Sequence, residues 1–300
     1  MKQFSVIVPN YNSPSVDQTI ASLERQDFDR DRYEIIVVGT DDYHLIPEGG
    51  QVRFIRSKDR ISPAAARNRG AACAEGEIVA FIDADCVADP GWLAVLAARF
   101  ADSSVIVVGG GVEFEKRRYW TLADNLSMFY AYRASCPPGY RRQLPSLNLA
   151  IRRITFQTIG GFDERYPRAA GEDADLTVRL RLQGHALVFE PRAVVVHRPA
   201  RDRWVDLWRH GFYQGKYSVK VDPRFARSDG LIWPLRTRWG ALLASPLLAT
   251  MVAIHIIAQS DLSAYWYTFP ALWLAKLAWC VGAACRPRGG VRWGMQLERD

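Results

Sequence analysis

The sequence has few cysteines, and their spacing is irregular. The five cysteines form no Cys-x-x-Cys pair and no spacing typical of a zinc site. We interpret them as reduced thiols of a protein that faces the cytosol, and not as a disulfide framework. They are Cys73, Cys86, Cys136, Cys280 and Cys285.

Two further signals are missing. The amino-terminal apolar run ends at Pro9, so it is too short for a signal peptide, and we expect no secretion by that route. The run Gly109-Gly110-Gly111 lacks the GxGxxG spacing and the following helix of a dinucleotide-binding site. It permits only a close approach of backbone, after a strand expected at 105–108.

Composition leaves several classes open. Three hundred residues, 49% of them hydrophobic, are enough for one large domain or two ordinary ones. A formal charge of +7 is compatible with nucleic acid, an anionic membrane surface or solubility alone.

The amino-terminal half alternates between strand and helix patterns. Strands are expected near 4–8, 33–38 and 52–55, and helices near 16–26 and 62–74. This alternation predicts an α/β fold with parallel strands and helices on both faces. Ligands bind beyond the carboxyl ends of such strands. The loops at Pro9, at 39–42 and at 83–85 should therefore face one crevice.

Two carboxylates follow an apolar strand at 77–82. Because alternate side chains of a strand share a face, Asp83 and Asp85 can point to the same side. Mg²⁺ and Mn²⁺ prefer carboxylate oxygens and keep water or phosphates as other ligands. The alternative is that both aspartates occupy a turn or cap the next helix.

Other charged residues follow expected elements. Glu172, Asp173 and Asp175 begin a helix, where they either complement its dipole or supply a general base. Arg67 lies on the helix at 62–74, where it is either solvated or able to hold a diphosphate. His197 ends a strand at 193–196.

The carboxy-terminal third changes in character. Residues 201–235 mix basic and aromatic side chains, which favours an amphipathic helix at a membrane interface over nucleic-acid binding. The apolar stretches 240–258 and 263–285 are each about as long as the roughly 20 residues that a membrane span needs. Their arginine-rich flanks place both ends in the cytosol. We expect a catalytic domain at 1–200, a connector at 201–235 and two transmembrane helices within 236–300.

The order of several short motifs resembles that of the family 2 glycosyltransferases, which have the GT-A nucleotide-sugar fold. The resemblance covers roughly the first two thirds of the chain, and its specificity lies in the order and spacing of the motifs. The segments are 5–12 (SVIVPNYN), 66–70 (ARNRG), 81–85 (FIDAD), 148–153 (NLAIRR), 160–164 (GGFDE) and 171–176 (GEDADL).

The resemblance implies a role for each matching residue. It implies that Asp85, Asp83 and His197 hold a divalent metal, Mg²⁺ or Mn²⁺, and that Asp173, with Glu172 beside it, is the catalytic base. It also implies a set of contacts to the donor nucleotide and its diphosphate. These come from Pro9, Asn10, Tyr11, Asp41, Arg67 and Asp83.

Two departures from the family pattern matter. The family commonly has an aspartate directly after the second strand, where this chain has Gly39-Thr40, so we expect Asp41 to substitute. The Gln-x-x-Arg-Trp motif of processive members is replaced by Gln214-Gly215-Lys216-Tyr217, which predicts transfer of one sugar.

The resemblance therefore implies an inverting, metal-dependent glycosyltransferase, and the two apolar stretches with their basic flanks predict that it lies at the cytosolic face of the cell membrane. Its donor would be a UDP-, GDP- or dTDP-linked sugar, and its acceptor a saccharide or lipid-linked saccharide, with membrane lipids as partners and no nucleic acid. The alternatives are a nucleotidyltransferase, or a non-catalytic membrane partner that binds a nucleotide sugar.

Overall fold

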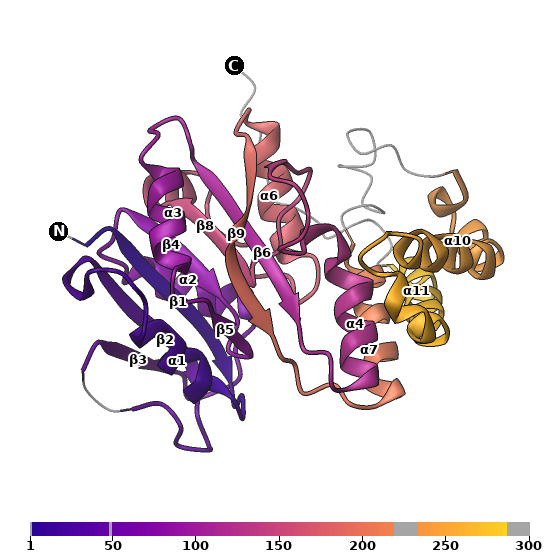
Figure 1. Ribbon diagram of the computed structural model, residues 1–300, viewed down its shortest axis with the longest axis horizontal. Coiled ribbons are helices and arrows are strands. Elements are labelled where there is room, and N and C mark those ends of the chain that lie inside the picture. Colours follow the sequence, from indigo (N-terminus) through magenta and orange to yellow (C-terminus); the bar gives the residue numbers. More distant parts are fainter. Residues whose placement is uncertain (1, 48–49, 219–232, 287–300) are drawn as a thin grey trace.

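A computed structural model describes residues 2–47, 50–218 and 233–286, and these residues form a mixed β-sheet with helices on both faces (Figure 1). The strand order is β3-β2-β1-β4-β8-β6-β9-β5, and β7 pairs with β9. The strands are β1 (Phe4–Tyr11), β2 (Tyr33–Thr40), β3 (Val52–Arg56), β4 (Ile78–Ile82), β5 (Cys86–Ala88), β6 (Val107–Phe114), β7 (Gly139–Tyr140), β8 (Asn148–Arg152) and β9 (Leu187–His197).

The amino-terminal half of the sheet is parallel, as the alternating pattern predicts. β1 pairs in parallel with β2 and β4, and β2 with β3. β8 runs antiparallel to both β4 and β6, which makes the whole sheet mixed. The carboxyl ends of β1, β2 and β4 therefore meet at one edge.

Successive residues of the central strands point to opposite faces. Val6 packs with α1 and α3 on one face, whereas Ile7 packs with α2, α5 and α6 on the other. Both faces are apolar because both are covered, which explains the nearly continuous hydrophobic strands. The helices on these faces are α1 (Val16–Glu24), α2 (Pro63–Ala72), α3 (Trp92–Phe100), α5 (Arg153–Thr158) and α6 (Glu172–Leu182), with the short η1 (Arg30–Arg32) before β2.

The glycine run lies inside a strand and not in a turn after it. A Cβ atom at Gly110 would lie 2.2 Å from the carbonyl oxygen of Ala193, so only glycine permits this approach of β6 to β9. The register of β6 and β9 shifts between Gly110 and Gly111, and the strand expected at 193–196 is the last part of the longer β9. The expected close backbone approach is confirmed.

The remaining helices gather at one end of the molecule, where α11 lies between α10 and the pair α4 and α7 (Figure 1). The bounds are α4 (Tyr119–Phe129), η2 (Tyr130–Tyr132), α7 (Trp204–Lys216), η4 (Trp233–Arg236), α9 (Arg238–Leu243), α10 (Ser245–Ile257), η5 (Ser263–Thr268) and α11 (Phe269–Ala284).

The structure corrects the prediction of two transmembrane helices. The first apolar stretch is divided into α9 and α10, and the second begins with the irregular η5. The 16 residues of α11 span only about 24 Å, less than the roughly 30 Å of a bilayer core. In the described part of the chain, no helix combines the length and the apolar character that crossing a bilayer requires.

Close packing explains why these apolar segments are arranged as short helices. A Cβ atom at Gly215 of α7 would lie 1.9 Å from the carbonyl oxygen of Trp279 in α11, and one at Gly282 would lie equally close to that of Phe212. Glycine therefore lets the two helix backbones touch. The connector expected at 201–235 is thus helical up to Lys216 and packed on α11, and its residues 219–232 lie outside the described chain.

Candidate functional site

A small pocket opens at the edge where the parallel strands end. Its volume is about 190 Å³. Pro9, Asn10 and Tyr11 from the end of β1 line it together with Gly39 and Thr40 from the end of β2. The loop at Pro9 therefore reaches the crevice at this edge of the sheet, as expected.

Backbone contacts shape the floor of this pocket. Nδ2 of Asn10 donates to the carbonyl oxygen of Thr40 at 2.8 Å. Oδ1 of Asn10 accepts from the backbone N–H of Ser13 at 3.1 Å. Gly39 has a φ of +138°, and a Cβ atom there would overlap the carbonyl oxygen of Asn10. This contact requires glycine at the position where the related family has aspartate.

Asp41 does not line this pocket. Its two carboxylate oxygens accept the backbone N–H groups of Leu45, at 3.1 Å, and Ile46, at 2.8 Å. The carboxylate therefore stabilises the loop after β2. The predicted contact between Asp41 and a nucleotide gains no support from this position.

Arg67 joins two of the predicted acidic residues. Its guanidinium donates to Asp83 at 2.7 Å and to Glu172 at 3.0 Å, and the arginine is only 1% exposed. Nε of Arg67 and Oε2 of Glu172 have no hydrogen-bond partner among the described residues. Burial and the neighbouring Asp173 raise the pKa of Glu172 to about 7, although Arg67 acts in the opposite direction.

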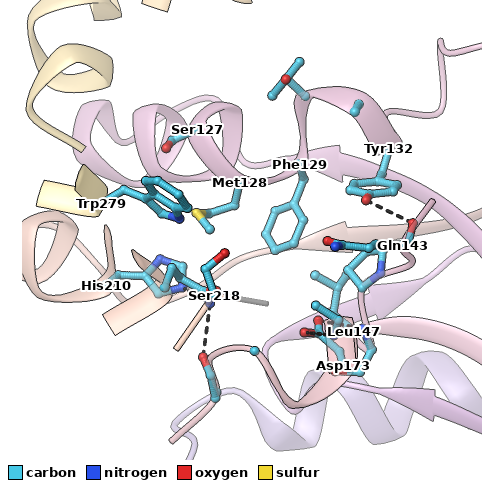
Figure 2. A pocket seen from close by; sticks show the side chains of 18 of the residues that line it. Ser127, Met128, Phe129, Tyr132, Gln143, Leu147, Asp173, His210, Ser218 and Trp279 are labelled. Carbon is cyan, nitrogen blue, oxygen red and sulfur yellow. Dashed lines mark hydrogen bonds between the residues drawn. The ribbon is translucent and has the colours of Figure 1, made fainter. Parts of the chain in front are cut away.

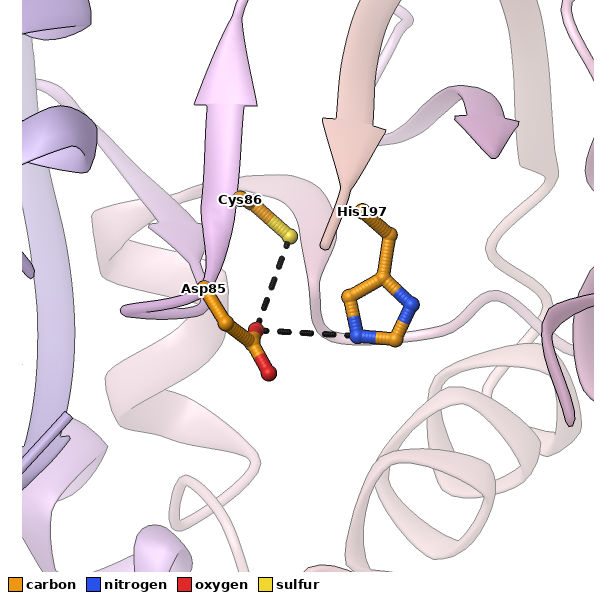
Figure 3. A group of neighbouring side chains, drawn as sticks. All are labelled: Asp85, Cys86 and His197. Atoms are coloured by element: carbon orange, nitrogen blue, oxygen red, sulfur yellow. Dashed lines mark hydrogen bonds and ion pairs between the residues drawn. The ribbon is translucent and has the colours of Figure 1, made fainter. Parts of the chain in front are cut away.

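Asp85 and His197 face each other beyond the strand ends (Figure 3). Oδ1 of Asp85 lies 3.6 Å from Nε2 of His197. Burial raises the pKa of Asp85, but the interactions with His197 and Arg201 outweigh it and lower the value to about 2.

These two residues and Cys86 form a group whose donor atoms lie within 4.8 Å of one another. Burial raises the pKa of the Cys86 thiol well above its usual value, and sulfur is a soft ligand that Mg²⁺ and Mn²⁺ do not favour. A carboxylate oxygen and an imidazole nitrogen are suitable ligands for Mn²⁺ or Mg²⁺. The donor set therefore fits a divalent cation held by Asp85 and His197.

Helix α4 orients this histidine from behind. Nδ1 of His197 lies 2.5 Å from Oδ1 of Asn125, and the ring packs edge-on against Phe129 at 5.2 Å. Because an amide oxygen only accepts, Nδ1 donates to it, and this bond turns Nε2 toward Asp85.

A second buried network adjoins the first. Asp124 accepts hydrogen bonds from Arg201 at 2.9 Å and from Nδ1 of His210 at 2.7 Å. Burial opposes ionisation of Asp124, but His210 and Arg201 hold its pKa below the usual range. Arg201 lines both pockets, so its cationic group lies beside Asp83 and Asp85.

Asp173 lies in the first turn of α6 and lines a larger cavity of about 420 Å³. Its carboxylate accepts the backbone N–H of Ser146 at 3.2 Å and that of Ala174 at 2.7 Å. Burial raises the pKa of Asp173 above its ordinary value, against the effect of these two N–H donors.

The cavity extends from this carboxylate to the carboxy-terminal helices. Figure 2 shows Asp173 and Leu147 on the wall opposite His210 and Trp279. The lining also includes the apolar Leu248 and Val252 of α10, together with Lys276 of α11. Asp83 and Arg67 line both the large and the small cavity, so the two are neighbours.

The structure thus brings together most of the residues that the sequence singles out. Asp83, Asp85, Arg67, Asp173 and His197 line adjoining cavities, and the buried Glu172 also lines the larger one, whereas Asp41 is in a separate loop. Further polar residues of the site had no motif to mark them. For Asp124 and Asn125 of α4, the only local signal is that they form a polar pair within the apolar helix pattern at 119–129. These residues are Asp124, Asn125, Ser146, Arg201 and His210.

The chain is similar to known glycosyltransferases. The family model described as glycosyl transferase family 2 matches residues 5–159, just over half of the chain. A pre-mycofactocin glycosyltransferase of Mycobacterium tuberculosis is 33% identical over an alignment of 205 residues, with 66% of this chain and 42% of that protein covered. The chain therefore spans less than half of that relative's length. Glycosyltransferase AglE of Haloferax volcanii is 26% identical, with 72% of this chain and 73% of that protein covered.

Solved structures support the fold. A mannosyltransferase from Pyrobaculum calidifontis, solved with GDP-Man and Mn²⁺, has a TM-score of 0.58 at 21% identity, with 91% of this chain and 85% of that chain covered. GalNAc-T7, solved with UDP, GalNAc and Mn²⁺, has a TM-score of 0.57 at 18% identity, with 81% and 51% covered. The α/β architecture is therefore GT-A-like, and the match over residues 5–159 shows that this chain belongs to glycosyl transferase family 2.

Proposed function

We propose that this protein is an inverting glycosyltransferase that transfers one sugar from a nucleotide diphosphate sugar to an acceptor hydroxyl. The observation that carries the proposal is that a carboxylate, Asp173, lines a cavity that shares Asp83 and Arg67 with the pocket beside Asp85. A base and a diphosphate site on neighbouring walls suit displacement at an anomeric carbon.

The small pocket is the proposed site of the nucleotide. Pro9 and Tyr11 line its wall, and Asn10 fixes the backbone there. Asp83 has 29% of its side chain exposed despite its contact with Arg67, which leaves an oxygen for a ribose hydroxyl or a metal. Relatives of this fold were solved with GDP-Man or UDP, which supports a nucleoside diphosphate in general.

Asp85 and His197 are the proposed metal ligands, with Asp83 nearby. A divalent cation held there supplies positive charge to the leaving diphosphate. Mn²⁺ is present in two structures of the same fold, and Mg²⁺ suits the same carboxylates. Arg201, beside Asp83 and Asp85, adds a fixed cation at the same place.

Asp173 is the proposed general base. Held by the N–H groups of Ser146 and Ala174, it accepts the proton of the acceptor hydroxyl as that oxygen attacks the anomeric carbon. The sugar–phosphate bond breaks on the opposite side, so configuration inverts. Glu172 supports this site indirectly, by holding Arg67.

The acceptor is proposed to be a saccharide carried by a lipid at the cytosolic face of the cell membrane. The apolar side of the large cavity, with Leu248, Val252 and Trp279, supports an acceptor that has an apolar part next to its sugar.

Identification of the released nucleotide tests this function. Purified protein is incubated with UDP-, GDP- and dTDP-sugars in Mn²⁺ or Mg²⁺, and the products are separated. Release of a nucleoside diphosphate, abolished by chelator, is expected. Release of pyrophosphate would instead indicate a nucleotidyltransferase, and binding without turnover would indicate a non-catalytic nucleotide-sugar-binding partner.

A further inference from the structure

The two helices before α11 present an exposed apolar stripe. Trp239, Leu243, Leu247, Met251 and Ile254 follow one another at spacings of three or four residues, and each is between 53% and 82% exposed. Trp239 and Leu243 therefore share one side of α9, and Leu247, Met251 and Ile254 share one side of α10. The two helices meet at the break at Ala244, so these exposed residues lie on adjacent helices.

The opposite side of the same helices is used for packing. Ala249, Ala253 and Ile256 of α10 are fully buried and lie toward α11. Figure 1 places α10 at the outer edge of the molecule, with α11 on its inner side. Large apolar side chains on the outer side of a surface helix mark an interaction site.

The charges near the stripe indicate which kind of partner it binds. The stretch 230–260 contains no aspartate or glutamate, and the exposed Arg236 lies just before Trp239. Basic groups beside a row of tryptophan, leucine and isoleucine are typical of helices that lie in the interface of an anionic membrane. A groove for a folded protein partner would more often include acidic and polar groups at its rim.

The stripe and the acceptor cavity share one helix. Leu248 and Val252, which line the cavity, directly follow Leu247 and Met251 of the stripe in sequence, about 100° around α10. An acceptor with an apolar chain could thus pass from a bilayer under the stripe to the cavity along apolar side chains.

We propose that this stripe is a membrane-docking surface that lies in the headgroup region of an anionic bilayer and brings the acceptor cavity to lipid-carried substrate. The inference rests on the proposed function for its purpose, but the binding itself is independent of catalysis. The sequence alone predicts that the two apolar stretches cross the membrane. In this proposal, the stripe binds to the membrane surface instead.

Vesicle flotation of the purified full-length protein tests the proposal. The probes are phosphatidylcholine vesicles with and without phosphatidylglycerol. The paired substitution Leu243→Glu and Leu247→Glu should lower partitioning by about tenfold or more, because two leucines no longer enter the apolar layer. Trp239→Gln is a second, independent variant. Ile154→Glu is the matched control, since Ile154 is 69% exposed on α5 and outside the stripe.

The expected result is binding that requires phosphatidylglycerol, is lost in the stripe variants and is kept in Ile154→Glu. Equal binding by all variants, or no binding by the unaltered protein, would overturn the proposal. A dimer that the paired substitution dissociates, without vesicle binding, would assign the stripe to a second copy of the chain. Donor hydrolysis without vesicles is measured in parallel: if it is absent while stripe-dependent binding remains, only the proposed function fails.

Discussion

The amide oxygen of Asn125 lies 2.5 Å from Nδ1 of His197. This bond fixes the ring so that Nε2 faces Asp85 from 3.6 Å. The two residues come from elements far apart in sequence, α4 and the end of β9. Helix α4 is therefore part of the proposed metal site as well as of the carboxy-terminal helical packing.

Replacing this amide should weaken metal binding. Asn125→Ala is expected to lower the affinity for Mn²⁺ by about 10- to 100-fold, since the imidazole loses its orienting acceptor. Titration of free Mn²⁺ by electron paramagnetic resonance measures this without activity. Asn68→Ala, which removes contacts to Phe162 and Glu164, is the control. Unchanged Mn²⁺ affinity in folded Asn125→Ala would refute the orienting role.

Loss of the proposed base should remove chemistry and spare donor binding. Asp173→Asn keeps the size of the side chain but accepts no proton, so turnover should fall by about 10²- to 10⁴-fold. Affinity for the nucleoside diphosphate, measured by calorimetry, should stay within about twofold of the original. Asp42→Asn, in an exposed loop, serves as the control. Near-normal turnover in Asp173→Asn would require another base.

The buried carboxyl of Glu172 should make stability depend on pH. Its pKa of about 7 in the folded protein exceeds the ordinary value of 4.5, so the folded state binds more protons between these values. Stability should therefore fall as pH rises from 4.5 to 7, by up to about 3 kcal/mol from this group.

Glu172→Gln should flatten that fall. The free energy of unfolding in urea, measured for both proteins at several pH values, gives the difference in slope, which matters more than the absolute stability of the variant. Glu164→Gln, at an exposed position, should leave the slope as in the unaltered protein. If the free energy of unfolding changed with pH at the same slope in all three proteins, the pKa of Glu172 would not be raised in the folded state.

The contact between α7 and α11 should tolerate no side chain at its centre. Gly215→Ala is expected to cost about 1 to 3 kcal/mol, because the added methyl group would overlap the carbonyl oxygen of Trp279. Urea unfolding measures the loss, and limited proteolysis should show cleavage after residue 216. Gly91→Ala is the control, since its added Cβ meets only the side chain of Asp89, at 3.5 Å. Equal stability of both variants would contradict the close packing.

The sequence by itself determined the catalytic half of the fold. Continuous apolar runs, such as the one that includes Val6 and Ile7, specify strands covered on both faces. Ser62 caps α2 through the N–H of Ala65, as its position before Pro63 predicts. The positions of Asp83, Asp85 and Asp173 followed from strand and helix ends, because such ends meet at one edge of a parallel sheet.

Tertiary structure decided which further residues join the site and how the carboxy-terminal segments pack, because no local sequence pattern marks either. Asn125, Asp124 and Arg201 join the site through contacts across more than 70 residues of sequence, and no spacing marks them. The carboxy-terminal stretches have the length and hydropathy of membrane spans, but glycine contacts between α7 and α11 and the break at Ala244 arrange them as short packed helices. Hydropathy measures how apolar a segment is, whereas its surroundings in the fold decide which face is buried and against what.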